Sequence, residues 1–148
     1  MQQQKKIIQF KSSINHYCAD ACIVWCFDDR FTPLLNEFIK ERGYKNYDLV
    51  KVAGGAKNLA EPDHETERLF ILKQIRTSIN LHNAKLVVLM CHEDCEAYGG
   101  EKIFQDSHKE REKLCQDLKE AEHILKNNLP ADVKIETVFA DFEGIKSV

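Results

Sequence analysis

The sequence predicts an α/β domain built on a mostly parallel β-sheet of about four strands, with helices on both faces of the sheet. Two observations indicate this fold. Short, continuously apolar runs alternate along the chain with longer segments that carry a helical apolar stripe. No internal repeat and no linker rich in Pro, Gly or Ser interrupts this alternation. Strands that are apolar on both faces are typical of a parallel sheet that helices cover on both sides.

The first predicted strand is residues 21–27 (ACIVWCF), a wholly apolar run of strand length. A helix follows it, with Thr32 as the N-cap and Pro33 at the first helical position. The apolar stripe of this helix consists of Leu34, Leu35, Phe38 and Ile39. Gly43 is expected to end the helix, because glycine readily adopts the left-handed conformation of a C-terminal cap.

A second strand is predicted at residues 47–53 (YDLVKVA), where Gly54 and Gly55 end it. The next predicted element is a helix over residues 65–80. Its expected inward side chains are Leu69, Leu72, Ile75 and Ile79. Residues 85–91 (KLVVLMC) form the third predicted strand, which is the clearest of the apolar runs.

The last part of the chain predicts one long helix and one strand. Ser107, with Glu110 three residues later, has the spacing of a capping box that opens a helix. The apolar face of this helix consists of Leu114, Leu118, Ala121 and Leu125. Its charged residues at 109–126 are expected to form the solvated face. Residues 133–139 (VKIETVF) follow Pro130 and form the last predicted strand.

Length and charge restrict the class of protein. The chain has 148 residues and a formal net charge of −3. We expect residues 1–20 to form an N-terminal arm and residues 21–148 a single α/β domain. The charge excludes a polycationic nucleic-acid-binding protein, and no apolar run approaches the roughly 20 residues of a membrane-spanning helix. The N-terminus lacks the apolar core of a signal peptide, so the sequence predicts a cytoplasmic protein without nucleic-acid or membrane partners.

The cysteines are unevenly distributed, at positions 18, 22, 26, 91, 95 and 115. Clustered cysteines in the reducing cytoplasm indicate a metal site or catalysis more than a disulfide framework. Four of them are expected to be small apolar side chains of the core: Cys18, Cys22, Cys91 and Cys115. A non-enzymatic alternative is a redox or metal sensor that uses exposed thiols of the 18–26 group.

Residues with reactive side chains follow three of the predicted strands. They are Cys26-Phe27-Asp28-Asp29-Arg30, Gly54-Gly55 and His92-Glu93-Asp94-Cys95. Parallel strands bring their carboxyl ends to one edge of the sheet, where ligands bind in open α/β folds. In an extended segment Cys26, Asp28 and Arg30 would project to the same side.

Cys26, His92 and Cys95 together would offer two sulfur ligands and one nitrogen ligand. Three protein ligands and one open position are the pattern of a catalytic zinc site, so the sequence predicts Zn²⁺ as cofactor, with Asp28 as a possible fourth ligand. Two alternatives remain for residues 28–30. They could be an ordinary surface turn, or a Mg²⁺ site of the kind that phosphoryl-transfer domains use, although that site would leave the cysteines unexplained.

These residues resemble the two zinc-binding motifs of the β-class carbonic anhydrases. Residues 26–30 match that family's Cys-x-Asp-x-Arg motif, and residues 92–95 match its His-x-x-Cys motif. Gly54 lies where the family has a glycine loop, and residues 138–144 resemble its closing strand and turn. The resemblance covers most of the chain from about Cys18 onward and implies a β-carbonic-anhydrase-like fold.

The resemblance also implies an activity, which is the reversible hydration of CO2 to bicarbonate by a zinc-bound hydroxide. In this reading Asp28 orients the hydroxide, Arg30 holds Asp28, and Gly54 and Gly55 bind the bicarbonate. The family further implies a homodimer or a dimer-based oligomer. Glu96 replaces the glycine that usually follows the second cysteine, so the alternative is a zinc-binding relative that acts on another small substrate or has little activity. Two thiolate ligands offset the charge of the zinc, so we expect alkaline pH to favour activity.

Overall fold

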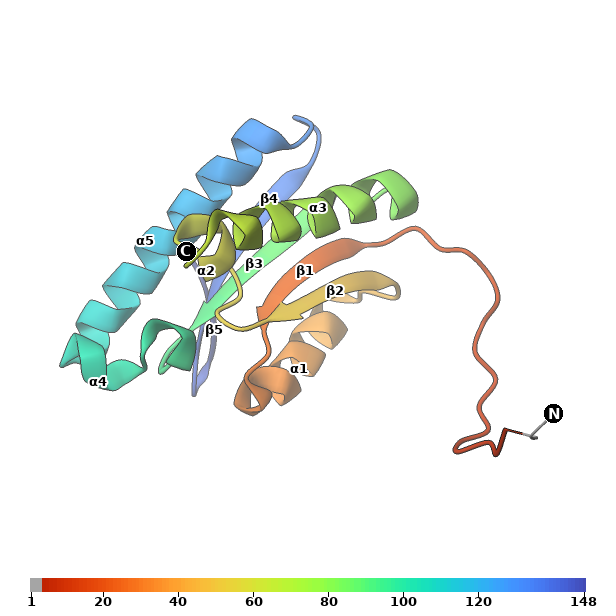
Figure 1. The fold of residues 1–148 in the computed structure, drawn as a ribbon, viewed down its shortest axis with the longest axis horizontal. Helices are drawn as coiled ribbons and strands as arrows, with labels where there is room; N and C mark the ends of the chain where they lie inside the picture. The colour runs from red at the N-terminus through yellow and green to blue at the C-terminus, as the bar shows by residue number, and fades with distance from the viewer. Residues whose placement is uncertain (1–3) are drawn as a thin grey trace.

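The computed structural model describes residues 4–148 and confirms the α/β fold and its mostly parallel sheet (Figure 1). Five strands lie in the order β2-β1-β3-β4-β5. Their bounds are β1 (Ala21–Cys26), β2 (Tyr47–Val52), β3 (Leu86–His92), β4 (Lys134–Asp141) and β5 (Gly144–Ser147). The first four strands are parallel, and β5 pairs antiparallel with β4. The sequence analysis does not predict β5, because this short edge strand contains one large apolar residue, Ile145, and is at best half-buried.

Helices cover both faces of the sheet, as predicted. The helices are α1 (Thr32–Arg42), α2 (Lys57–Ala60), α3 (Glu65–His82), α4 (Glu101–Phe104) and α5 (Ser107–Asn128), with short 3-10 helices η1 (Asp29–Phe31) and η2 (Glu96–Tyr98). α1 packs on one face, where Trp25 and Met90 are fully buried. α2, α3 and α5 pack on the other face, over Val24 and Leu89 (Figure 1).

The starts of two helices differ from the predictions by one residue. Gly43 ends α1 in the left-handed conformation, as predicted, with φ 67°. Thr32 is the first residue of that helix rather than its N-cap, and its Oγ1 accepts a hydrogen bond from Lys51 Nζ. The N-cap of α5 is Asp106, which accepts from the Lys109 N–H at 2.7 Å, so the predicted Ser107 capping box is wrong.

The apolar stripe of α3 is also rotated relative to the prediction. Leu72 and Ile75 are buried as predicted, Ile79 is partly buried, and Ile71 joins them. Leu69 is 57% exposed. At about 100° per residue, Leu69 lies roughly 120° around the helix from Ile75, so it cannot face the sheet.

The N-terminal segment runs away from the domain (Figure 1). Residues 4–18 contain no helix or strand, and every residue in this stretch is exposed. The expectation that Cys18 is a core residue is therefore wrong, whereas Cys22 and Cys91 are buried as predicted. Cys115 is partly buried and packs against the core. Within residues 4–148, no helix combines the length and apolarity that crossing a bilayer requires.

Candidate metal centre

The carboxyl edge of the sheet brings Cys26, His92 and Cys95 together. Cys26 and His92 are the last residues of the neighbouring strands β1 and β3, and Cys95 lies in the turn that follows β3. The two Sγ atoms and one imidazole nitrogen all lie within 4.8 Å of one another. None of the three residues is more than 3% exposed. The prediction that these side chains converge is therefore confirmed.

The imidazole of His92 is oriented so that one nitrogen is free. Its Nδ1 lies 2.7 Å from the Glu93 carbonyl oxygen, so Nδ1 carries the hydrogen and Nε2 keeps its lone pair. Nε2 is buried and has no hydrogen-bond partner in the described chain. The ring of Phe31 packs on the imidazole at 4.2 Å between centroids. A buried nitrogen without a partner is unusual, and a backbone carbonyl on the other nitrogen is typical of a metal-binding histidine.

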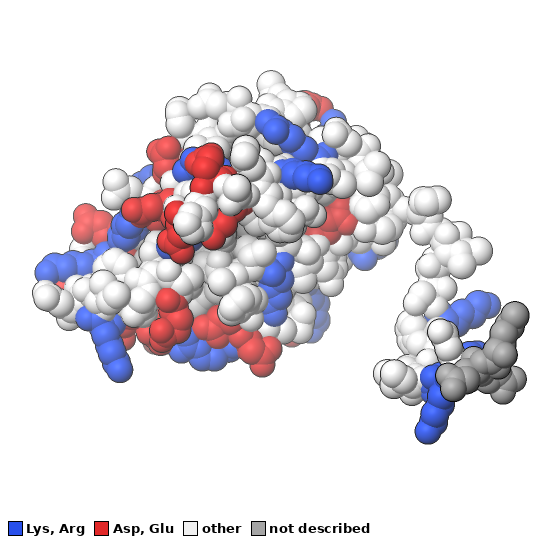
Figure 2. Space-filling model, viewed as in Figure 1, with Lys and Arg blue, Asp and Glu red and all other residues white. Residues whose placement is uncertain are grey.

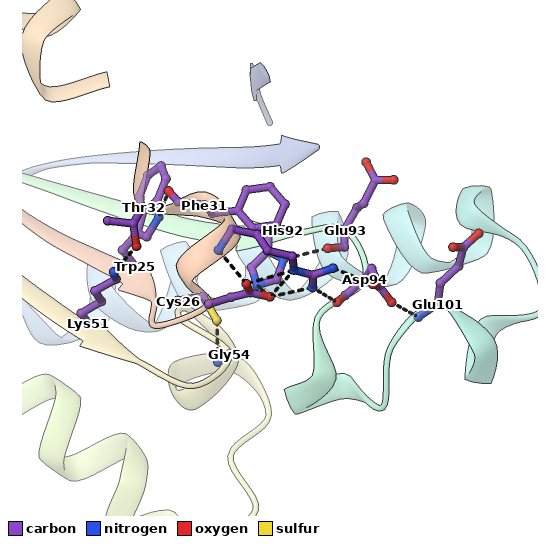
Figure 3. Close-up of polar contacts among 12 residues, drawn as sticks. Trp25, Cys26, Phe31, Thr32, Lys51, Gly54, His92, Glu93, Asp94 and Glu101 are labelled. Atoms are coloured by element: carbon purple, nitrogen blue, oxygen red, sulfur yellow. Dashed lines mark hydrogen bonds and ion pairs between the residues drawn. The ribbon is translucent and has the colours of Figure 1, made fainter. Parts of the chain in front are cut away.

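The two thiols share a strongly polarised environment. A hydrogen bond with Cys95 holds the pKa of Cys26 well below its usual range, and the same bond raises the pKa of Cys95. The Gly54 N–H also donates to Cys26 Sγ at 3.3 Å (Figure 3). Burial alone would lower the pKa of His92, but the neighbouring Cys26 sulfur raises it above its ordinary value. A thiolate is the form of cysteine that binds a metal ion, and the lowered pKa of Cys26 favours this form.

The loop after β2 requires glycine at two positions. Gly54 has φ 81° and Gly55 has φ 52°. A Cβ atom on Gly55 would lie 2.4 Å from the Met90 carbonyl oxygen, so no larger residue fits. The Gly54 N–H is used on Cys26, and the Gly55 N–H donates to the Val52 carbonyl at 3.1 Å. The binding of bicarbonate by this loop stays a prediction, and the observed contact is with a candidate ligand.

Asp28 and Arg30 form a bidentate ion pair beside the three donors. Arg30 Nη2 donates to Asp28 Oδ2 at 2.6 Å, and Arg30 Nε lies 3.0 Å from Oδ1. This contact forms because the chain turns into η1 after Asp28, so the extended segment expected for residues 26–30 is wrong. Hydrogen bonds from Arg30 hold the pKa of Asp28 below its ordinary value. The carboxylate is therefore ionised and fixed.

Arg30 is itself held from two further sides. Its Nη1 donates to the Asp94 carboxylate at 3.0 Å, and its Nη2 donates to the Asp94 carbonyl at 3.0 Å (Figure 3). The guanidinium also lies over the ring of Phe142, 5.3 Å from its centroid. Sequence reasoning assigns no role to Asp94 or Phe142. Asp94 lies inside the His-x-x-Cys motif, but nothing in the sequence shows that Arg30 reaches across to it from another strand end.

The donor set fits Zn²⁺ with one position left open. Two sulfur atoms and one imidazole nitrogen are characteristic zinc ligands. Within residues 4–148, no carboxylate oxygen belongs to the group of atoms that lie within 4.8 Å of one another. Asp28 Oδ2 lies 3.9 Å from His92 Nε2, and it is bound to Arg30.

Two buried carboxylates of α5 are not predicted from the sequence. The expectation that the charged residues at 109–126 are solvated is wrong for Glu110 and Asp117, which are 1% and 4% exposed. Asp117 accepts hydrogen bonds from Tyr98 Oη and Lys113 Nζ, both at 2.8 Å. Neither carboxylate oxygen of Glu110 has a hydrogen-bond partner in the described chain. In an amphipathic helix, these positions are indistinguishable from the charged residues beside them.

Comparison with known proteins shows the family. A family model described as "Putative carbonic anhydrase" matches residues 18–146. An uncharacterized protein of Rickettsia bellii (strain RML369-C) is 25% identical over 153 residues, which cover 98% of this chain and 93% of that protein. The carbonic anhydrase of Streptococcus mutans has a similar fold, with a TM-score of 0.64 at 16% identity over 94% of this chain and 87% of that one.

A further solved structure has the same architecture. A tetrameric β-carbonic anhydrase of Sordaria macrospora gives a TM-score of 0.63 at 12% identity, covering 89% of this chain and 81% of that one. At such identities, structural likeness shows the fold alone. The family model, by contrast, spans most of the sequence. The chain therefore belongs to the putative carbonic anhydrase family and has the fold of the β-carbonic anhydrases.

Proposed function

We propose that this protein is a zinc lyase that reversibly hydrates CO2 to bicarbonate. The observation that carries the proposal is the buried Cys26, His92 and Cys95 cluster, with its unpartnered imidazole nitrogen. An ionised Asp28 lies beside this nitrogen, so the open position would face a hydrogen-bond acceptor. A surface turn or a Mg²⁺ site explains neither the thiols nor the free nitrogen.

Each residue has a distinct part in this mechanism. Cys26, His92 and Cys95 would hold the zinc, which when bound supplies the Lewis acidity that makes water a stronger acid near neutral pH. Asp28 accepts a hydrogen bond from the attacking water and orients it toward the carbon of CO2. Arg30 keeps the Asp28 carboxylate ionised and in place through charge-assisted bonds. One oxygen–carbon bond forms while the π bond of one C=O group of CO2 breaks and its electron pair moves to that oxygen, and the proton lost by the water leaves to solvent.

The bidentate pair with Arg30 also bears on which group would occupy the fourth coordination position of the metal. An Asp28 carboxylate that bound the metal would have to give up part of its hydrogen bonding with Arg30. Because Asp28 accepts from both Nε and Nη2 of Arg30, we propose that Asp28 stays off the metal and leaves the fourth position to water.

The test is stopped-flow CO2 hydration by the full chain, with zinc content measured on the same samples. We expect one zinc per chain and catalysed hydration that increases toward alkaline pH. Asp28→Asn should retain the zinc and lower the rate at least tenfold, since it removes the anionic acceptor. The matched control is Asp29→Asn, because Asp29 is the exposed neighbour of Asp28 and should tolerate the change.

The same assay separates this function from its alternative. A zinc-loaded wild-type chain that is as inert as Asp28→Asn across the alkaline range would contradict CO2 hydration. That result would favour a zinc-binding relative with another small substrate. A chain that binds no zinc would contradict both.

We further propose that the protein is a homodimer in a cytoplasmic setting. Four apolar side chains on the N-terminal segment are between 80% and 97% exposed: Ile7, Ile8, Phe10 and Ile14. The charged residues of this segment are basic, whereas the face of the domain seen in Figure 2 mixes acidic and basic side chains. A second copy would cover the apolar residues, and light scattering should then give twice the mass of the chain. All six cysteines are free thiols, which suits a reducing compartment.

A further inference from the structure

Glu110 is a buried carboxyl group with no compensating hydrogen bond. It lies near the start of α5 and is 1% exposed, and both of its carboxylate oxygens lack a partner in the described chain. Burying a polar group in this way costs free energy of folding. The residue therefore reduces the stability of the chain as the structure describes it, and a purely structural role does not account for it.

The carboxyl faces the turn that carries a candidate metal ligand. Burial raises the pKa of Glu110, and the backbone N–H groups of Asp94 and Cys95, which face the carboxyl, act in the opposite direction. These N–H groups make no hydrogen bond of ordinary geometry within residues 4–148. The Glu110 carboxyl and the two N–H groups therefore face one another, and within residues 4–148 neither side has a hydrogen bond of ordinary geometry.

The other polar groups of this turn are already engaged. The Glu93 N–H donates to the Ala140 carbonyl at 2.9 Å, and the Glu93 carbonyl orients His92. The Asp94 carbonyl accepts from Arg30 at 3.0 Å. The Cys95 carbonyl accepts from the N–H groups of Tyr98 and Gly100. Asp94 has φ 53°, a left-handed conformation that is uncommon for residues other than glycine, although aspartate tolerates it better than most.

We propose that Glu110 is a positioning residue, whose carboxylate accepts the backbone N–H groups of Asp94 and Cys95 and so fixes the turn that presents the Cys95 thiol to the metal. The inference rests on the proposed zinc site. Because Asp94 also binds Arg30, the same contact would align the ion pair of Arg30 and Asp28 with the metal. Glu110 would act through the turn, without touching zinc or substrate.

Asp117 provides a matched comparison on the same helix. It is buried to nearly the same extent, but both of its oxygens are satisfied by Tyr98 and Lys113. Removal of the charge from Asp117 should therefore weaken the fold. Substitution of Glu110 removes an acceptor that makes no ordinary hydrogen bond, so it should weaken the metal site rather than the fold.

The test measures zinc affinity and metal-free stability in Glu110→Gln, Asp117→Asn and wild type, each as the full chain. Competition with a chromogenic chelator gives the zinc Kd, and thermal unfolding of the metal-free protein gives the stability. We expect Glu110→Gln to raise the Kd about tenfold, because one of the two acceptor oxygens becomes an NH2 donor that cannot accept a backbone N–H, with an unchanged or higher unfolding temperature. Asp117→Asn should lower the unfolding temperature and leave the Kd within about twofold of wild type.

A visible spectrum of the Co²⁺-loaded chains provides a second readout, because its bands report the geometry of the ligands. The bands should shift in Glu110→Gln and not in Asp117→Asn. Should Glu110→Gln fail to fold, Glu110→Met, which has similar length and no acceptor, is judged by the same criteria.

The outcomes separate this inference from the proposed function. Tight zinc binding by wild type with an unchanged Kd in Glu110→Gln would overturn the role of Glu110 alone. Equal loss of affinity in Glu110→Gln and Asp117→Asn would show a general effect of helix stability, and would also overturn it. Absence of zinc binding by wild type would refute the metal centre itself.

Discussion

One polar cluster lies at the amino edge of the sheet, where the parallel strands begin, and another lies at the carboxyl edge, where they end. The two clusters differ in whether their polar atoms have hydrogen-bond partners. At the amino edge, Asp48 accepts hydrogen bonds from Tyr17 Oη and Ser78 Oγ, each at 2.6 Å, and lies 2.8 Å from His82 Nδ1. At the carboxyl edge, His92 Nε2 and both oxygens of Glu110 have no partner in the described chain. Both clusters join residues that are distant in the sequence.

The difference separates polar groups whose hydrogen bonds hold the fold from buried polar groups that make no hydrogen bond in the described chain. A satisfied cluster stabilises the chain on its own, because each buried polar atom recovers the hydrogen bond that it loses to water. An unsatisfied cluster costs stability until something binds it. Substitutions at the amino edge should therefore affect stability and spare zinc binding. Substitutions at the carboxyl edge should do the reverse.

The largest effect is expected from the thiols of the carboxyl edge. Cys26→Ser and Cys95→Ser should each reduce the zinc content from one per chain to nearly none, because a hydroxyl is a far poorer ligand for zinc than a thiolate. Metal analysis of the purified chains measures this loss. Cys115→Ser is the control, since Cys115 lies on α5 and does not belong to the cluster. Full zinc content in either site variant would contradict the proposed ligand set.

A smaller loss is expected from Arg30, which shapes the site without binding the metal. Arg30→Lys should lower the rate of CO2 hydration roughly tenfold, because a lysine cannot bind both oxygens of Asp28 and also reach Asp94. Zinc content and thermal stability should remain close to wild type, since Arg30 is partly exposed. An unchanged rate would show that the orientation of Asp28 does not depend on this ion pair.

The ligand cluster could be predicted from the sequence because the pattern and the topology agree. Apolar runs such as residues 21–27 indicate strands buried on both faces, and parallel strands place their carboxyl ends at one edge. Cys26 and His92 end neighbouring strands, so their convergence follows from the order of the sheet. The distance between them in the sequence has no bearing on this outcome.

What the sequence analysis misses depends on contacts that have no local pattern. Glu110 and Asp117 alternate with exposed charges along α5, and only the packing of this helix in the fold shows that they are buried. The pairing of Arg30 with Asp94 depends on the turn of η1. His82 is similar, because no pattern in the sequence indicates that it packs against Tyr17 and binds Asp48.

The smallest effect is expected at the amino edge, where the cluster around Asp48 should stabilise the fold without affecting zinc binding. Asp48→Asn should lower the free energy of unfolding by about 1 kcal/mol at neutral pH, since it weakens the hydrogen bonds from Tyr17, Ser78 and His82. Zinc affinity should not change. Burial alone would raise the pKa of Asp48, but these hydrogen bonds lower it below its ordinary value.

The lowered pKa of Asp48 predicts how the stability difference between wild type and Asp48→Asn changes with pH. A carboxyl whose pKa is lowered by folding contributes stability that is complete above its unfolded pKa of about 4, and the contribution is lost as the pH falls through the lower folded value. The difference between wild type and Asp48→Asn should therefore be constant above about pH 5 and shrink as the pH falls below about 4. Urea denaturation at each pH measures it. A difference that stays constant would show that the charge of Asp48 does not stabilise the fold, and a loss of zinc would show that the two edges are not independent.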